Sequence, residues 1–177
     1  MQNLQKEADI ARAYLAKIAK LAEQKFDEHL PPETDVPCNL HKAMRYSVFA
    51  GGKRLRPGLA CAAFELFGGK GDSIWYATSA LEFLHTFSLI HDDLPCIDND
   101  DFRRGRPTAH KQFGEATAVM SGDALCVLAF ELIAKTKNPQ AMESLAYKLG
   151  TYGMIGGEMT DIDSEGKKVS LDVVDYI

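Results

Sequence analysis

The feature that most constrains the fold is an apolar helical run that ends in a dense cluster of charge. Residues 81–90 read LEFLHTFSLI, and residues 91–106 read HDDLPCIDNDDFRRGR. An ordinary solvated surface does not place so many acids and arginines at the end of a core helix. Carboxylates hold hard cations through oxygen, and arginines take phosphate oxygens in a planar fork. The sequence therefore predicts a magnesium and polyphosphate site at this helix end.

The two acids at the ends of the cluster, Asp92 and Asp98, are six residues apart. On a regular helix they would be about 240° out of phase. Pro95 lies between them, and proline removes a backbone donor and clashes with the preceding turn. We therefore expect the helix to kink or end there, so that Asp98 swings back towards Asp92. Crowded carboxylates repel unless a cation lies between them, and oxygen ligands favour magnesium or manganese over zinc. The alternative is a solvated acidic loop with surface salt bridges.

A second motif, GGKRLRP, occupies residues 51–57. A Gly-Gly turn lets backbone amides approach an anion, and the start of the following helix adds partial positive charge. Lys53 and Arg56 are three residues apart and can converge on one diphosphate. The alternative is a basic helix start on the protein surface.

Apolar residues recur at helical spacing along the chain, and strict apolar–polar alternation never lasts more than a few positions. The pattern predicts an all-α fold over residues 1–177, with a proline-rich loop at residues 31–37. The expected helices cover residues 4–30, 39–50, 57–67, 72–92, 109–135, 139–160 and 170–177.

Composition limits the function classes. The net charge of −5 argues against a general nucleic-acid binder, which usually carries a basic excess. The four cysteines are widely spaced without a CxxC pair, which favours free thiols in a reducing compartment. The most apolar stretch, residues 124–134, is short for a membrane span and contains Glu131, and no signal peptide is evident. We expect a cytoplasmic protein that spans no membrane.

Together, GGKRLRP and LEFLHTFSLIHDDLPCIDNDDFRRGRPTAH resemble the trans-isoprenyl diphosphate synthases, the polyprenyl synthetase family, and most of all bacterial farnesyl and geranylgeranyl diphosphate synthases. The resemblance extends over essentially the whole chain. It implies an isoprenoid-synthase-type helical bundle around a central cavity, usually homodimeric. Such proteins condense isopentenyl diphosphate with an allylic diphosphate such as dimethylallyl or geranyl diphosphate. Terpene cyclases share an acidic helix, but GGKRLRP and the paired Arg103 and Arg104 argue against a cyclase.

The resemblance also implies a role for each charged residue of the two motifs. His85 is two helical turns before Asp92 and so lies on roughly the same face. His91 has no such support and is interpreted as structural. The implied roles are magnesium (or manganese) binding by Asp92 and Asp98, assistance at the metal by Asp93, isopentenyl diphosphate binding by Lys53, Arg56, His85 and Arg104, and allylic diphosphate binding by Arg103.

Product length is expected to depend on two residues upstream of the acids. Phe87 and Ser88 precede Asp92 by five and four residues, along the wall that a growing prenyl tail would follow. A bulky ring there shortens the cavity, and each excluded methylene is worth about 0.8 kcal/mol. An aromatic at this place, with the two extra residues in the acidic motif, resembles bacterial-type farnesyl diphosphate synthases, so the resemblance implies farnesyl diphosphate as product. The alternatives are a geranylgeranyl diphosphate synthase and a non-catalytic partner subunit of a full-length synthase.

Two features depart from the family pattern. Glu158 stands where the family usually has a glutamine, in the segment that ends at Asp161. The lysine–threonine step and the second aspartate-rich motif of the family are not found in the sequence, and residues 170–177 resemble the opening turns of a helix without a C-cap. We expect the chain to be the N-terminal portion of one helical domain, truncated after its first aspartate-rich half, and to be inactive or severely impaired alone.

Overall fold

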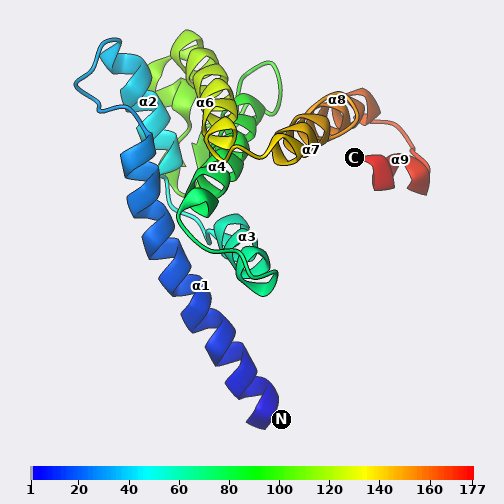
Figure 1. The fold of residues 1–177 in the computed structure, drawn as a ribbon. Coiled ribbons are helices and arrows are strands. Elements are labelled where there is room, and N and C mark those ends of the chain that lie inside the picture. Colours follow the sequence, from blue (N-terminus) through cyan, green and yellow to red (C-terminus); the bar gives the residue numbers. More distant parts are fainter. Residues whose placement is uncertain (1) are drawn as a thin grey trace. The chain divides into compact units, whose positions relative to one another are not determined.

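The computed structural model describes residues 2–177 (Figure 1). Along the chain these residues divide into two compact units, with the boundary between Thr136 and Lys137. The described residues are predominantly helical, so the predicted all-α class is confirmed.

The first unit contains six helices and one small hairpin among its described residues. Strands β1 (Phe102–Arg103) and β2 (Arg106–Pro107) pair antiparallel. The two residues between them, Arg104 and Gly105, both have positive φ (54° and 76°), as tight hairpin turns require. The hairpin was not predicted because two-residue strands are too short to show alternation. The helices are α1 (Gln2–His29), α2 (Cys38–Val48), α3 (Leu55–Leu66), α4 (Ser73–Asp92), α5 (Ala109–Phe113) and α6 (Glu115–Lys135).

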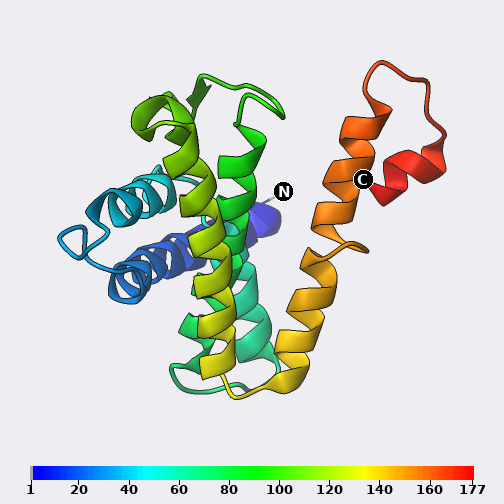
Figure 2. The same ribbon diagram turned by 90° about the horizontal axis from the view of Figure 1, so that it is seen from above.

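Helices α4 and α6 lie side by side and form the centre of the first unit (Figure 2). Phe83 of α4 and Leu125 of α6 are fully buried. The two helices approach closely at Gly122, where an added Cβ would lie 2.3 Å from Nε2 of His91. Nε2 of His91 also lies 3.1 Å from the carbonyl oxygen of Val119 on α6. These are the contacts of a packing residue, in line with the structural interpretation of His91.

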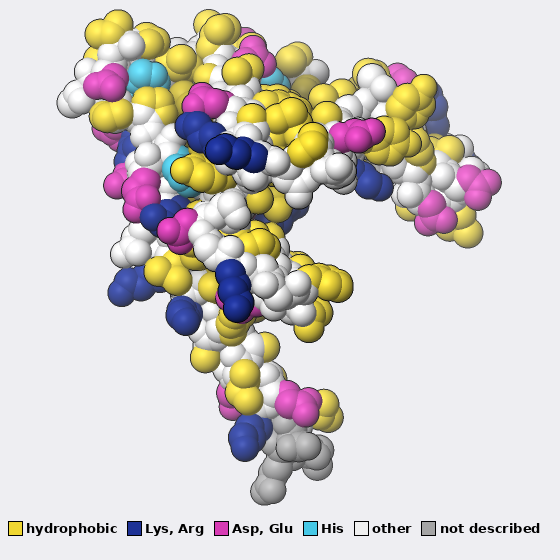
Figure 3. Space-filling view, viewed as in Figure 1, with side chains coloured by type: hydrophobic (Ala, Val, Ile, Leu, Met, Phe, Trp, Pro, Cys, Tyr) yellow, Lys and Arg dark blue, Asp and Glu magenta, His cyan; other side chains and the backbone are white. Residues whose placement is uncertain are grey.

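The core extends from α4 to the C-terminal part of α1. The ring of Phe26 is fully buried and lies 5.7 Å from that of Phe83. The N-terminal part of α1 is mostly exposed, as at Leu4 and Ile10, and Figure 3 shows charged side chains interspersed with apolar ones along it. Only the C-terminal part of this helix therefore supports the core that carries α4.

Helix α6 is long and apolar enough to cross a membrane by length and composition alone. Core helices pass the same test, and α6 buries Leu125, Ala129 and Leu132 in the first unit. These buried residues follow the helical repeat, as expected for a helix that packs one face against a core. The expectation that the chain spans no membrane stays a prediction.

The second unit contains α7 (Pro139–Leu149), α8 (Met154–Ser164) and α9 (Leu171–Tyr176). Helix α7 begins as predicted, with Pro139 in its first turn and the Asn138 side chain accepting a hydrogen bond of 3.0 Å from the Ala141 amide. Helix α9 begins after Ser170, close to the predicted start.

Two helices that were predicted as continuous are interrupted by glycine. The predicted helix 109–135 breaks at Gly114, whose φ of 87° is incompatible with a right-handed helix. The predicted helix 139–160 breaks between Leu149 and Met154, and its second part continues to Ser164. At this break an added Cβ on Gly153 would lie 1.9 Å from the Lys148 carbonyl oxygen. The apolar periodicity continues across both breaks, so it did not reveal them.

Candidate functional site

The acidic cluster begins where α4 ends, at Asp92. After Pro95 the chain turns back, and the Asp98 amide donates a hydrogen bond of 2.9 Å to the Asp92 carbonyl oxygen. The Asn99 amide donates one of 3.0 Å to the Leu94 carbonyl oxygen, which closes the turn. The prediction that the helix ends near Pro95 and that Asp98 returns to Asp92 is therefore confirmed.

The carboxylates of Asp92 and Asp98 repel each other in this turn. Burial and the charge of Asp98 raise the pKa of Asp92, and Arg103 only partly opposes this rise. Asp92 is half-buried, whereas Asp98 is exposed. The pair is thus a concentration of negative charge, and a cation would relieve its repulsion.

The two carboxylates are oxygen donors, of the kind that hard divalent cations prefer. Among the residues that the structure describes, no group of three or more His, Cys, Asp or Glu side chains gathers to hold a metal ion. Magnesium usually takes only one or two carboxylates and completes its shell with water and substrate phosphates. Asp92 and Asp98 would supply these carboxylates.

Asp93 points into the protein. Its side chain is buried, and its Oδ1 accepts a hydrogen bond of 2.8 Å from Nε of Arg103. The same oxygen lies 2.7 Å from Nη2 of Arg103 in an ion pair. Burial raises the pKa of Asp93, and the ion pair with Arg103 opposes that rise. Asp93 therefore orients Arg103. Its expected assistance at the metal stays a prediction. The predicted role of Arg103 in allylic diphosphate binding stays a prediction.

The four residues predicted to bind isopentenyl diphosphate line one cleft of about 540 Å³ in the first unit. Lys53 and Arg56 are exposed, and neither makes an ion pair with the acidic side chains that the structure describes. Their charges are therefore available to an anion from solvent. The four residues are Lys53, Arg56, His85 and Arg104.

His85 is a neutral member of this cationic cleft. Burial and the positive charge of Arg56 lower its pKa to about 4, although Glu82 opposes the decrease. A neutral imidazole offers one N–H donor and one acceptor nitrogen. His85 can therefore donate a hydrogen bond to a phosphate oxygen near neutral pH without carrying charge.

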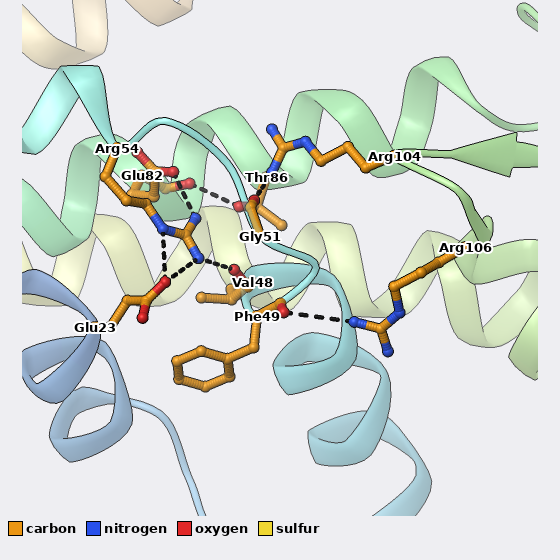
Figure 4. A network of polar contacts seen from close by, with 9 residues as sticks. All are labelled: Glu23, Val48, Phe49, Gly51, Arg54, Glu82, Thr86, Arg104 and Arg106. Atoms are coloured by element: carbon orange, nitrogen blue, oxygen red, sulfur yellow. Dashed lines mark hydrogen bonds and ion pairs between the residues drawn. The ribbon is translucent and has the colours of Figure 1, made fainter. Parts of the chain in front are cut away.

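Arg104 connects the hairpin to the glycine loop, residues 51–54, which precedes α3. Its Nη1 donates a hydrogen bond to the Gly51 carbonyl oxygen (Figure 4). At Gly52 an added Cβ would lie 2.7 Å from the same Nη1. Gly52 has a φ of 141°, a conformation that other residues rarely adopt. Gly52 therefore leaves the space in which the Arg104 guanidinium lies.

Arg54 was not predicted as a site residue. It is 3% exposed and donates from Nη1 to Glu82 Oε1 (2.8 Å) and from Nη2 to the Val48 carbonyl oxygen (2.8 Å). Glu23 lies 3.3 Å from the same guanidinium (Figure 4). One signal in the sequence could have found this network, because Glu82 is a charged residue within the apolar run of α4.

Phe87 and Ser88 are both half-buried on α4. The Phe87 ring makes an edge contact with the His91 ring at 4.8 Å. The Ser88 hydroxyl donates to the His85 carbonyl oxygen at 3.0 Å. Their predicted effect on product length is not tested by these contacts.

Comparisons with known proteins place the chain in one family. The polyprenyl synthetase family model matches residues 37–177. Geranylgeranyl pyrophosphate synthase 4 of Arabidopsis thaliana is 45% identical over 94% of this chain and 46% of its own length. The heterodimeric geranylgeranyl pyrophosphate synthase large subunit 1 of the same plant is 45% identical, over 93% of this chain and 47% of its own length.

Among solved structures, an FPP/GFPP synthase from Zymomonas mobilis is 40% identical and superposes with a TM-score of 0.88. The match covers 96% of this chain and 64% of that one. The chain thus spans about half the length of the curated relatives it matches.

Proposed function

This chain belongs to the polyprenyl synthetase family, and we propose that it forms the isopentenyl diphosphate cleft and the first magnesium-binding carboxylate pair of a trans-prenyltransferase. One observation carries the proposal. Lys53, Arg56, His85 and Arg104 meet in one cleft, and His85 lies on the same helix as Asp92, two turns away.

The proposed reaction joins the two substrates without a protein nucleophile. Lys53, Arg56 and neutral His85 bind the diphosphate of isopentenyl diphosphate. Arg103, oriented by Asp93, binds the allylic diphosphate. Magnesium held by Asp92 and Asp98 would offset the charge that develops on the leaving diphosphate. The allylic C–O bond breaks to give a carbocation, the double bond of isopentenyl diphosphate attacks it, and loss of a proton restores an alkene.

We propose geranylgeranyl diphosphate as the product, in preference to the farnesyl diphosphate expected from Phe87. The curated relatives above are named geranylgeranyl pyrophosphate synthases, which supports the longer product. Helix phase supports it as well. At about 100° per residue, Ser88 is only about 40° from the face of Asp92, whereas Phe87 is about 140° away. Of the two residues expected to set product length, the small Ser88 is then closer to the metal face, which supports a longer tail path.

Isopentenyl diphosphate binding tests the proposal directly. Isothermal titration should show binding to the 177-residue chain, and Lys53→Ala should weaken it about tenfold or more, because a charge-assisted hydrogen bond is worth about 1.5–3 kcal/mol. Lys42→Ala, which removes an exposed lysine of α2 outside this cleft, is the matched control. Equal affinity of both variants and the unsubstituted chain would refute the cleft.

Turnover and assembly are also proposals. Because no second aspartate-rich motif is found in the sequence, we expect strongly reduced turnover from the 177-residue chain. We propose a cytoplasmic homodimer. The name of the heterodimeric relative favours a second candidate, a subunit that pairs with a different synthase chain. Light scattering of the purified chain tests the homodimer, and a monomer would contradict it.

A further inference from the structure

The cationic side chains of the GGKRLRP motif differ in their exposure to solvent. Lys53 and Arg56 are exposed in the cleft, whereas Arg54 between them is 3% exposed. Arg54 has left-handed backbone angles (φ 49°, ψ 37°) at the residue that precedes α3. Such a conformation is costly for a residue with a side chain, so it persists only where the surroundings hold it. The contacts of the Arg54 guanidinium supply such surroundings.

Those contacts join separate elements of the first unit. Arg54 reaches the last turn of α2 through the Val48 carbonyl oxygen and reaches α4 through Glu82. Arg54 and Glu82 are 3% and 4% exposed, so both charges are removed from water (Figure 4). A buried ion pair adds little net stability, but loss of one partner leaves the other charge uncompensated. The pair therefore favours one arrangement of the loop against α4.

Glu82 is one helical turn before His85 on α4. Its carbonyl oxygen accepts a hydrogen bond of 2.8 Å from the Thr86 hydroxyl, which is buried in the same turn. Both Glu82 and His85 line the cleft that Lys53 and Arg56 also line. The ion pair thus links the loop side of the cleft to its helix side.

We propose that the Arg54–Glu82 ion pair is a positioning element of the diphosphate cleft, which holds Lys53 and Arg56 opposite His85. The inference rests on the proposed function of this cleft. Neither member of the pair contacts the substrate. Both act through Lys53, Arg56 and His85, which do.

An electrostatic role and a positioning role of Glu82 predict opposite effects of its substitution on diphosphate affinity. Its carboxylate is on the wall of an anion-binding cleft, so removal of its charge should by Coulomb's law strengthen diphosphate binding. If Glu82 instead holds the loop in place, the same substitution should weaken binding, because misplacement of binding groups by about 1 Å has large effects. The sign of the change therefore separates positioning from charge.

The experiment measures the affinity of the 177-residue chain for inorganic pyrophosphate without metal, by isothermal titration. Glu82→Gln should weaken binding about tenfold or more. Glu23→Gln, the same substitution at the half-exposed partner of Arg54 on α1, is the matched control and should change the affinity by less than about twofold. Circular dichroism melting confirms that each variant is folded at the titration temperature.

A second variant covers the case in which Glu82→Gln does not fold. Arg54→Met combined with Glu82→Met removes both buried charges and keeps the buried volume, a replacement that folded proteins often tolerate. It should also bind pyrophosphate about tenfold more weakly.

Lys53→Ala separates the inference from the function on which it rests. Unchanged or tighter pyrophosphate binding by folded Glu82→Gln or by the double variant, together with weaker binding by Lys53→Ala, would overturn the positioning role and leave the cleft intact. Unchanged binding by Lys53→Ala would overturn the cleft itself, and the positioning role with it.

Discussion

The two glycines of the glycine loop allow a paired test of whether Arg104 binds anions in the cleft. Gly51 and Gly52 have φ values of 86° and 141°, so alanine is strained at either position. An added Cβ meets nothing within 4 Å at Gly51, but at Gly52 it would lie 2.7 Å from Nη1 of Arg104. That atom is the end of a flexible side chain, so the guanidinium will move away. Gly52→Ala therefore displaces Arg104, and Gly51→Ala does not.

Both substitutions should cost about 1–3 kcal/mol of unfolding free energy from backbone strain. Only Gly52→Ala should also lose the contribution of Arg104 to anion binding, about 1.5–3 kcal/mol for a hydrogen bond to a charged group. This energy corresponds to a loss of about 10- to 150-fold in pyrophosphate affinity. Urea denaturation measures the first effect, and isothermal titration measures the second. Equal pyrophosphate affinity of the two variants would refute the assignment of Arg104 to the cleft.

Two further predictions concern the helix that carries the site. Phe83 is fully buried against Phe26, so Phe83→Ala should lose about 3–5 kcal/mol of unfolding free energy, and a loss below about 1 kcal/mol in urea denaturation would contradict the described core. His85 has its pKa lowered from 6.5 to about 4, so between these values the unfolded chain binds more protons than the folded one. Stability should therefore rise with pH across this window and be fully present above it, and His85→Gln should flatten that rise in melting curves. A variant with the unchanged pH profile would show that His85 titrates normally.

The parts of the site that could be predicted from sequence are those fixed by local sterics. Pro95 cannot continue a helix, so the end of α4 and the return of Asp98 follow from the residues themselves. The joining of Lys53 and His85 in one cleft depends on tertiary packing, and only the family resemblance indicated it. Arg54 looks like its exposed neighbours in the sequence, and its burial depends on Glu82, 28 residues later.

The hairpin also could not be predicted from the sequence. The turn at Arg104 and Gly105 lies in a hairpin with two residues in each strand, too few to show a repeat. The expectation from Phe87 rested on its distance from Asp92 along the chain. The contacts of Phe87 and Ser88 do not test it, so the effect of these residues on product length stays a prediction.

The proposed function requires two chemically different diphosphate sites on one chain. The most direct test compares Lys53→Ala and Asp98→Asn by isothermal titration with two ligands, isopentenyl diphosphate without metal and a non-ionisable allylic diphosphate analogue with magnesium. Lys53→Ala should weaken the first and spare the second, whereas Asp98→Asn should spare the first and abolish the magnesium dependence of the second. Loss of both bindings in each folded variant, or of neither, would contradict the account.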